Sequence, residues 1–168
     1  INFTGPFQYN QDQRVAIRAM ADILQTRLRE SLREELGGTY SVSAGARYEN
    51  RPREQYQVSI SFGSDPARAE ALAARVLQEI EAFKTHGPTE KQVSDAKTKL
   101  DRDFETNIKQ NAYVLSQLSF RYDQGDTPEA LLDVPNYYRK LSVAAIQAAA
   151  KEYLNTTRYV KVVLLPEK

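Results

Sequence analysis

The sequence contains no cysteine and a single histidine, His86, among its 168 residues. Without cysteine the chain cannot form a disulfide framework, a thiolate zinc site or a thiol nucleophile. One imidazole cannot supply a pair of histidine zinc ligands, and a serine triad would have to depend on it alone. His86 also lies at a predicted helix end, where an imidazole more often meets the helix dipole or solvent than a metal. The chain therefore offers few groups for metal or nucleophilic catalysis.

The sequence also lacks an excess of charge and a long apolar run. Its 23 Lys and Arg residues balance 22 Asp and Glu residues, with a net charge of +1 and no long basic run, so we expect no nucleic-acid partner. No stretch approaches the roughly 20 apolar residues that span a bilayer, so we expect no membrane insertion. The glycines match neither a Walker A loop nor the dinucleotide fingerprint, which leaves nucleotide binding without support.

Hydrophobic periodicity predicts strands at both ends and in the middle of the chain, with helices between them. A capping box formed by Asn10 and Gln13 opens a helix that ends at Gly37–Gly38. Two segments then alternate apolar and polar residues, as in an antiparallel hairpin with one solvated face. The predicted strands are 1–5, 40–48, 55–62 and 158–166, and the predicted helices are 10–36, 66–86, 89–122, a short one from 127, and 142–154.

This order predicts an α+β fold in which helices pack on one face of an antiparallel sheet. The length suits one domain, residues 1–168, and is too short for two ordinary ones. Because the chain opens on Ile1 within a strand-like segment and without Met, we expect it to be a domain excised from a longer chain. The predicted core includes Leu24, Leu28, Val42, Val58, Ile60, Leu100 and Val162.

The most specific motif is a run of arginine and glutamate followed by glycine and TYSV, within RLRESLREELGGTYSVSA at 27–44. Supporting segments are YQVSISFGSDP at 56–66, GPTEKQVSDAKTKL at 87–100 and YVKVVLLPEK at 159–168. Over nearly the whole chain, these motifs resemble the second-half domains of the pitrilysin/insulinase zinc peptidases. The resemblance implies a LuxS/insulinase-like metallopeptidase domain. Peptidases of this family consist of repeated α+β domains arranged as two halves, and the two halves close around a chamber.

In that family an N-terminal domain carries the zinc motif H-x-x-E-H and a more distant glutamate ligand. This chain, with one histidine, departs from that pattern, so it should contain no catalytic residue, no metal ligand and no cofactor. The resemblance places zinc and the general base in a homologous domain or subunit and implies a peptide as the substrate. It also favours the bacterial periplasm or cell envelope as the location. By itself, the domain is expected to be inactive.

The resemblance makes Arg33 and Tyr40 the candidate substrate-binding residues. In similar domains an arginine at the helix end and a tyrosine at the start of the next strand project across the chamber. Guanidinium and phenol donors suit a developing oxyanion or the carbonyls of a peptide. Arg27 and Arg29 are alternatives for the arginine. Structural roles stay open as well, with Arg33 in a surface ion pair and Tyr40 in the core.

The polar faces of the two middle strands are consistent with either a chamber wall or ordinary solvent exposure. They carry Ser41, Ser43, Arg47, Gln57, Ser59 and Ser61. The alternative function is a structural or assembly domain of the same fold that never contacts peptide.

Overall fold

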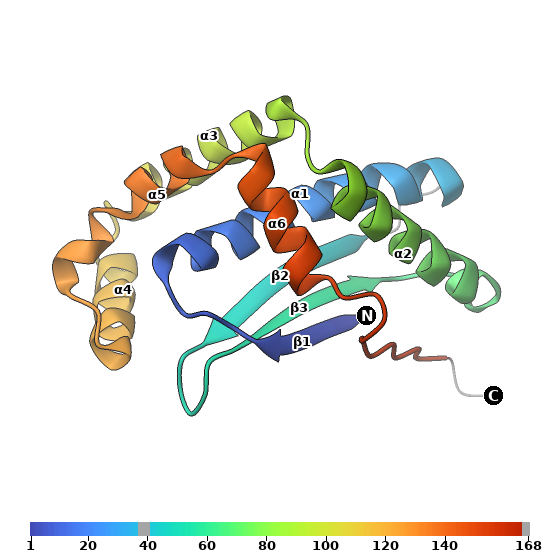
Figure 1. Cartoon of the computed structure of the whole chain (residues 1–168), viewed down its shortest axis with the longest axis horizontal. Helices are drawn as coiled ribbons and strands as arrows, with labels where there is room; N and C mark the ends of the chain where they lie inside the picture. The colour runs from blue at the N-terminus through green and yellow to red at the C-terminus, as the bar shows by residue number, and fades with distance from the viewer. Residues whose placement is uncertain (37–40, 166–168) are drawn as a thin grey trace.

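The structure of the chain is a computed structural model that describes residues 1–36 and 41–165, with the side chains of 33–36 left aside. The described part contains three strands, six α-helices and two short 3₁₀ segments (Figure 1). In chain order they are β1 (Asn2–Pro6), α1 (Gln11–Leu36), β2 (Val42–Glu49), β3 (Gln55–Phe62), η1 (Pro66–Arg68), α2 (Ala69–His86), α3 (Glu90–Asn107), α4 (Asn111–Gln124), η2 (Pro128–Leu131), α5 (Val134–Lys140) and α6 (Val143–Tyr153).

The sheet is antiparallel throughout and has the strand order β1-β3-β2. Val58 of β3 sits between Phe3 of β1 and Ala46 of β2, and this register places the apolar residues of all three strands on one face. Val58 and Phe3 are fully buried, whereas their neighbours Gln57 and Thr4 are exposed on the other face. The predicted hairpin, with one apolar and one polar face, is confirmed.

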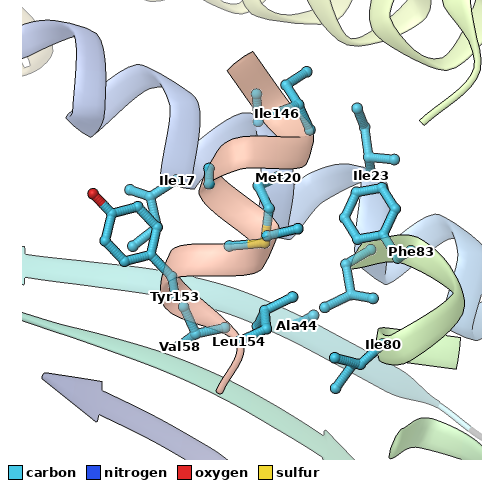
Figure 2. Packing of buried hydrophobic residues seen from close by; sticks show 14 of the residues in the cluster. Ile17, Met20, Ile23, Ala44, Val58, Ile80, Phe83, Ile146, Tyr153 and Leu154 are labelled. Carbon is cyan, nitrogen blue, oxygen red and sulfur yellow. The ribbon is translucent and has the colours of Figure 1, made fainter. Parts of the chain in front are cut away.

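Helices α1, α2 and α6 cover the apolar face of the sheet (Figure 1). Their side chains meet those of the strands in a single cluster, which Figure 2 shows from close by. It joins Met20 of α1, Phe83 of α2 and Ile146 of α6 to Val58 of the sheet, all of them fully buried. The predicted α+β fold is therefore confirmed, and so is the burial of Leu24, Leu28, Val42, Val58, Ile60 and Leu100.

The helix predicted over 89–122 is wrong in one respect, because it is two helices. α3 ends at Asn107 and α4 begins at Asn111, with Gln110 in an extended conformation between them. The segment TNIKQN at 106–111 includes β-branched residues and asparagines, which favour a helix less than the residues before it. The break sets α4 at an angle to α3 (Figure 1), and Leu115 of α4 is 68% exposed.

The strand predicted over 158–166 is also wrong within the described residues. Only Val160 forms a bridge, with Asn2 of β1, and the chain then continues to 165 without pairing. Val162, predicted to be buried, is 64% exposed. An alternating apolar pattern favours a strand, but the strand also needs neighbours to pair with and pack on, and beyond the bridge the described part of the chain offers none.

Candidate functional site

The polar face of the sheet is a surface that the described helices leave uncovered. It presents outward-facing residues of all three strands, since α1, α2 and α6 lie on the opposite side (Figure 1). Its members are Asn2 and Thr4 of β1, Ser43, Gly45, Arg47 and Glu49 of β2, and Gln55, Gln57, Ser59 and Ser61 of β3. We call these residues the outer sheet face.

Short polar side chains on the outer sheet face pair with one another across the strands. The hydroxyls of Ser43 and Ser61, which are opposite in the register, lie 2.7 Å apart. Asn2 Oδ1 accepts hydrogen bonds from Ser59 Oγ at 2.7 Å and from Gln57 Nε2 at 3.1 Å. These pairs hold small neutral donors and acceptors in fixed positions on the outer sheet face. Arg47 and Glu49 are also exposed on this face and carry one charge of each sign, so the outer sheet face has no net charge and can contact extended chains of varied sequence.

The edge of β2 that faces away from β3 borders a cavity of about 600 Å³, which also touches α1, α3 and α4. The N–H of Ala44 points toward this edge and donates to Gln25 Oε1 at 3.1 Å. Because backbone groups alternate along an antiparallel strand, Ala46 and Tyr48 direct their N–H and C=O groups the same way. One end of the free edge is therefore covered by a side chain, and the rest faces the cavity.

The predicted substrate-binding residues, Arg33 and Tyr40, lie on either side of Gly37–Gly38 in the sequence. The backbone of Arg33 lies in the last turns of α1, but its side chain falls outside the described part of the structure, as does Tyr40. The assignment of these two residues therefore stays a prediction.

The alternative Arg27 is engaged elsewhere. Its Nε and Nη2 atoms lie 2.8 and 2.7 Å from Glu79 Oε1 of α2. Its guanidinium also lies 5.2 Å from the ring centre of Phe83. Only 19% of the Arg27 side chain is exposed, so this residue joins α1 to α2. Arg29 is exposed on α1.

The structure brings together a charged cluster that the sequence analysis missed. Arg14 of α1 and Arg121 of α4 are 6% and 2% exposed, and both face Asp126, which follows α4. Burial, followed by the charge of Arg14, lowers the pKa of Arg121. A signal was present in the sequence, since Arg14 stands at helical spacing from Ile17 on the apolar stripe of α1. A charge at a core position of that kind indicates a buried partner.

Metal ligands do not gather in the described residues. His86 is exposed at the end of α2, and no group of three His, Cys, Asp or Glu side chains in residues 1–32 and 41–165 could hold an ion. No described helix is at once long and apolar enough to cross a membrane.

Comparisons with known proteins agree with this architecture. The probable zinc protease PqqL of Haemophilus influenzae is 26% identical over 167 residues, a match that covers 96% of this chain but 18% of that protein. The periplasmic protease PqqL from Escherichia coli matches with a TM-score of 0.79 at 19% identity, over 91% of this chain and 17% of that one. The inactive peptidase domain of a candidate zinc protease from Bordetella parapertussis matches with a TM-score of 0.81 at 15% identity, over 99% of this chain and 91% of that one.

The chain thus spans about a fifth of the length of the PqqL proteins, and nearly the whole of the Bordetella domain. The two solved structures share its fold, a small antiparallel sheet covered by helices. Residues 1–100 match the family described as the Peptidase M16 inactive domain, and this chain belongs to that family of zinc-protease domains.

Proposed function

We propose that this chain is the metal-free part of a zinc peptidase, where it completes the substrate chamber and helps to hold an extended peptide. A homologous domain, on the same chain or on another, supplies the zinc ion and the general base. The observation that carries this proposal is the outer sheet face, a polar surface that no described helix covers. In an inactive domain of a zinc-protease family, such a surface can contribute to substrate binding if the peptide lies against it.

The chemistry of the outer sheet face suits a substrate of variable sequence. Its hydroxyl and amide groups are small, and several are already oriented by the Ser43–Ser61 and Asn2–Ser59 pairs. Orienting these groups in advance lowers the entropic cost of binding. Because these pairs are neutral and the charges of Arg47 and Glu49 balance, the choice of cleavage site is left to the domain that carries the zinc ion.

Arg33 and Tyr40 are proposed to hold the peptide near the bond that is cleaved. The ion pair between Arg27 and Glu79 supports this choice, since it engages one of the two competing arginines within the domain. The remaining competitor is Arg29, which precedes Arg33 by about one turn of α1.

The test uses the full-length or reconstituted peptidase with four variants, Arg33→Ala, Tyr40→Phe, Arg29→Ala and Arg102→Ala. Removing a donor aimed at a charge that develops in the transition state lowers turnover by about 10²–10³. We expect this loss in Arg33→Ala, a smaller one in Tyr40→Phe, and none in Arg102→Ala, which alters an exposed residue of α3.

Melting temperatures of the same preparations separate binding from structural roles. The proposal requires them to stay nearly unchanged, because an exposed ion pair is usually worth under about 1 kcal/mol. Lower stability with normal activity per folded molecule would assign structural roles instead. A loss of turnover in Arg29→Ala but not in Arg33→Ala would transfer the role to Arg29.

An assembly domain of the same fold is the second candidate function. It is favoured by the exposed apolar segment at the end of the described chain, where Val162 and Leu165 are each 64% exposed and Leu164 is 92% exposed. The motif H-x-x-E-H upstream in the full-length gene product would favour the peptidase. Its absence would favour a scaffold or a separate catalytic subunit.

The periplasm is the proposed location. The relative from Escherichia coli is described as a periplasmic protease, and this description supports the proposal. Fractionation of the source cells with an antibody against this domain tests the proposal.

A further inference from the structure

Two buried arginines share one carboxylate where α4 meets the start of α1. Arg14 Nη1 donates to Asp126 Oδ2 at 3.1 Å, and Arg121 Nη1 lies 3.6 Å from the same oxygen. Exposed fractions of 6% for Arg14 and 2% for Arg121 show that both are in the interior, while the Asp126 side chain keeps 33%. A guanidinium stays protonated in proteins, so the cluster carries one more positive than negative charge.

Other groups around the cluster do not remove this excess. Asp133 lines a small cavity beside the cluster, and Asp103 and Glu49 line the larger one beside β2, but none of the three makes an ion pair with Arg14 or Arg121. The guanidinium of Arg14 lies 5.0 Å from the ring centre of Tyr9 and 5.5 Å from that of Phe120. Cation–π contacts of this kind offset part of the cost of burying Arg14, but they add no negative charge.

The cluster also has hydrogen-bond donors to spare. Arg14 Nε, Arg121 Nε and the Tyr9 hydroxyl are buried without a hydrogen-bond partner, and among the buried side-chain atoms of the described chain only Gln124 Oε1 is an unpaired acceptor. Burial raises the pKa of Tyr9, so its hydroxyl stays protonated and can donate. Buried donors are nearly always paired in native proteins, and unpaired ones indicate a missing acceptor.

Two cavities give access to the cluster. One of about 160 Å³ is lined by Tyr9, Arg14, Arg121 and Asp126, and the cavity of about 600 Å³ beside β2 is lined by both arginines. The larger cavity also touches β2 from Gly45 to Glu49, along its free edge. A peptide beside this edge would have a path to the arginines.

We propose that Arg14 and Arg121 form a carboxylate-binding pocket that receives an acidic side chain or the C-terminal carboxylate of a bound peptide. This inference rests on the proposed role in holding peptide and adds a chemical preference to it. A carboxylate supplies both the missing negative charge and acceptors for several guanidinium N–H groups. Asp126 remains in place and orients the two arginines.

Three short peptides distinguish the sources of the carboxylate. They are acetyl-Ala-Val-Ala-Glu-amide, its glutamine counterpart, and acetyl-Ala-Val-Ala-Ala with a free C-terminus. Binding to the 168-residue chain is followed by titration and by the NMR signals of the arginine Nε–H groups. We expect at least one carboxylate peptide to bind about tenfold tighter than the glutamine peptide, because hydrogen bonds between charged groups contribute more to the binding free energy than those of a neutral amide. The same peptide should shift the Arg14 and Arg121 signals. The Glu peptide tests the side chain, and the free C-terminus tests the chain end.

Variants of the cluster are compared with an exposed arginine. Arg121→Lys keeps the charge but loses the planar fork, and should weaken carboxylate binding about tenfold. Arg102→Ala removes one exposed positive charge from α3 and should leave it unchanged within about twofold. Asp126→Asn leaves the two arginines without their carboxylate, so the melting temperature of this variant should be lower than that of the wild type. Adding the carboxylate peptide should then raise the melting temperature of the variant by more than it raises that of the wild type.

The pocket is overturned if neither carboxylate peptide binds more tightly than the glutamine peptide, and equally if both carboxylate peptides fail to bind at millimolar concentration. If Arg102→Ala and Arg121→Lys weaken carboxylate binding equally, the affinity would come from the overall positive charge of the protein and not from a specific pocket. These binding measurements depend neither on turnover nor on Arg33 and Tyr40. A negative binding result therefore does not contradict the proposed role in the chamber, and a negative turnover result does not change the interpretation of the binding data.

Discussion

Ile60 shows what a single side chain contributes to the centre of the sheet. It lies in β3 opposite Ala44 of β2, is 1% exposed, and belongs to the cluster under α1 and α2. Ile60→Ala should cost about 2–5 kcal/mol of unfolding free energy, because it loses apolar burial and leaves a cavity. Denaturant melts measure the loss. Ser61→Ala, the next residue on the outer sheet face, is the control and should cost under about 1 kcal/mol. A similarly small loss for Ile60→Ala would contradict the assignment of this strand.

Glu81 gives a pH-dependent prediction. Hydrogen bonds from Lys84 and then Thr156 lower the pKa of its carboxyl below the ordinary 4.5. A carboxyl whose folded-state pKa is depressed stabilises the fold above its unfolded-state pKa and loses that contribution as the pH falls through the folded-state value. Glu81→Gln should therefore lower the melting temperature at pH 7 and have almost no effect once the pH lies below both values. A difference that persists in acid would show that the side chain acts through packing.

At the scale of elements, α6 fixes the end of α2. Gln147 Nε2 donates to the carbonyls of Lys84 at 3.0 Å and Thr85 at 2.9 Å, groups that have no partner within a helix. The chain then turns at Gly87, whose φ of 71° favours glycine, and a Cβ there would come within 3.3 Å of Gln147. Gln147→Ala should cost about 1–2 kcal/mol through the two lost hydrogen bonds.

Chemical denaturation of Gln147→Ala is compared with Gln78→Ala, a control at an exposed position of α2. Hydrogen exchange in the last turn of α2 should rise in Gln147→Ala alone. If exchange there stays at the wild-type level, Gln147 does not hold this helix end.

The elements also show where sequence patterns suffice and where they fail. Capping at Asn10 and Thr89 and the alternation of 55–62 are local signals, and the structure follows them. The break at Gln110 follows the weak helix formers of 106–111, a local signal that apolar periodicity does not record. The segment after Val160 remains unpaired for a different reason, because a strand needs a neighbouring strand to pair with.

At the scale of the whole molecule, the same limit applies to the candidate site. The outer sheet face was predictable, since alternation in one hairpin determines which residues share a side. The cluster of Arg14, Arg121 and Asp126 was predictable only in part. Arg14 on the apolar stripe of α1 indicates a buried partner, but Arg121 and Asp126 lie more than 100 residues further along the chain, and nothing local identifies them. Arg33 and Tyr40 came from the resemblance alone, and their side chains fall outside the described residues.

The last prediction concerns the chain as an isolated unit. It should bind no stoichiometric zinc and cleave no peptide, because one histidine and no cysteine leave only carboxylates, which make weak zinc sites without nitrogen or sulfur partners. Elemental analysis after dialysis measures the metal, and a quenched fluorescent peptide measures cleavage. One tightly held zinc ion per chain, with peptidase activity that a chelator abolishes, would overturn the prediction. Mixing the chain with its zinc-bearing partner domain is the complementary test, since turnover should then exceed that of the partner alone if this domain completes the chamber.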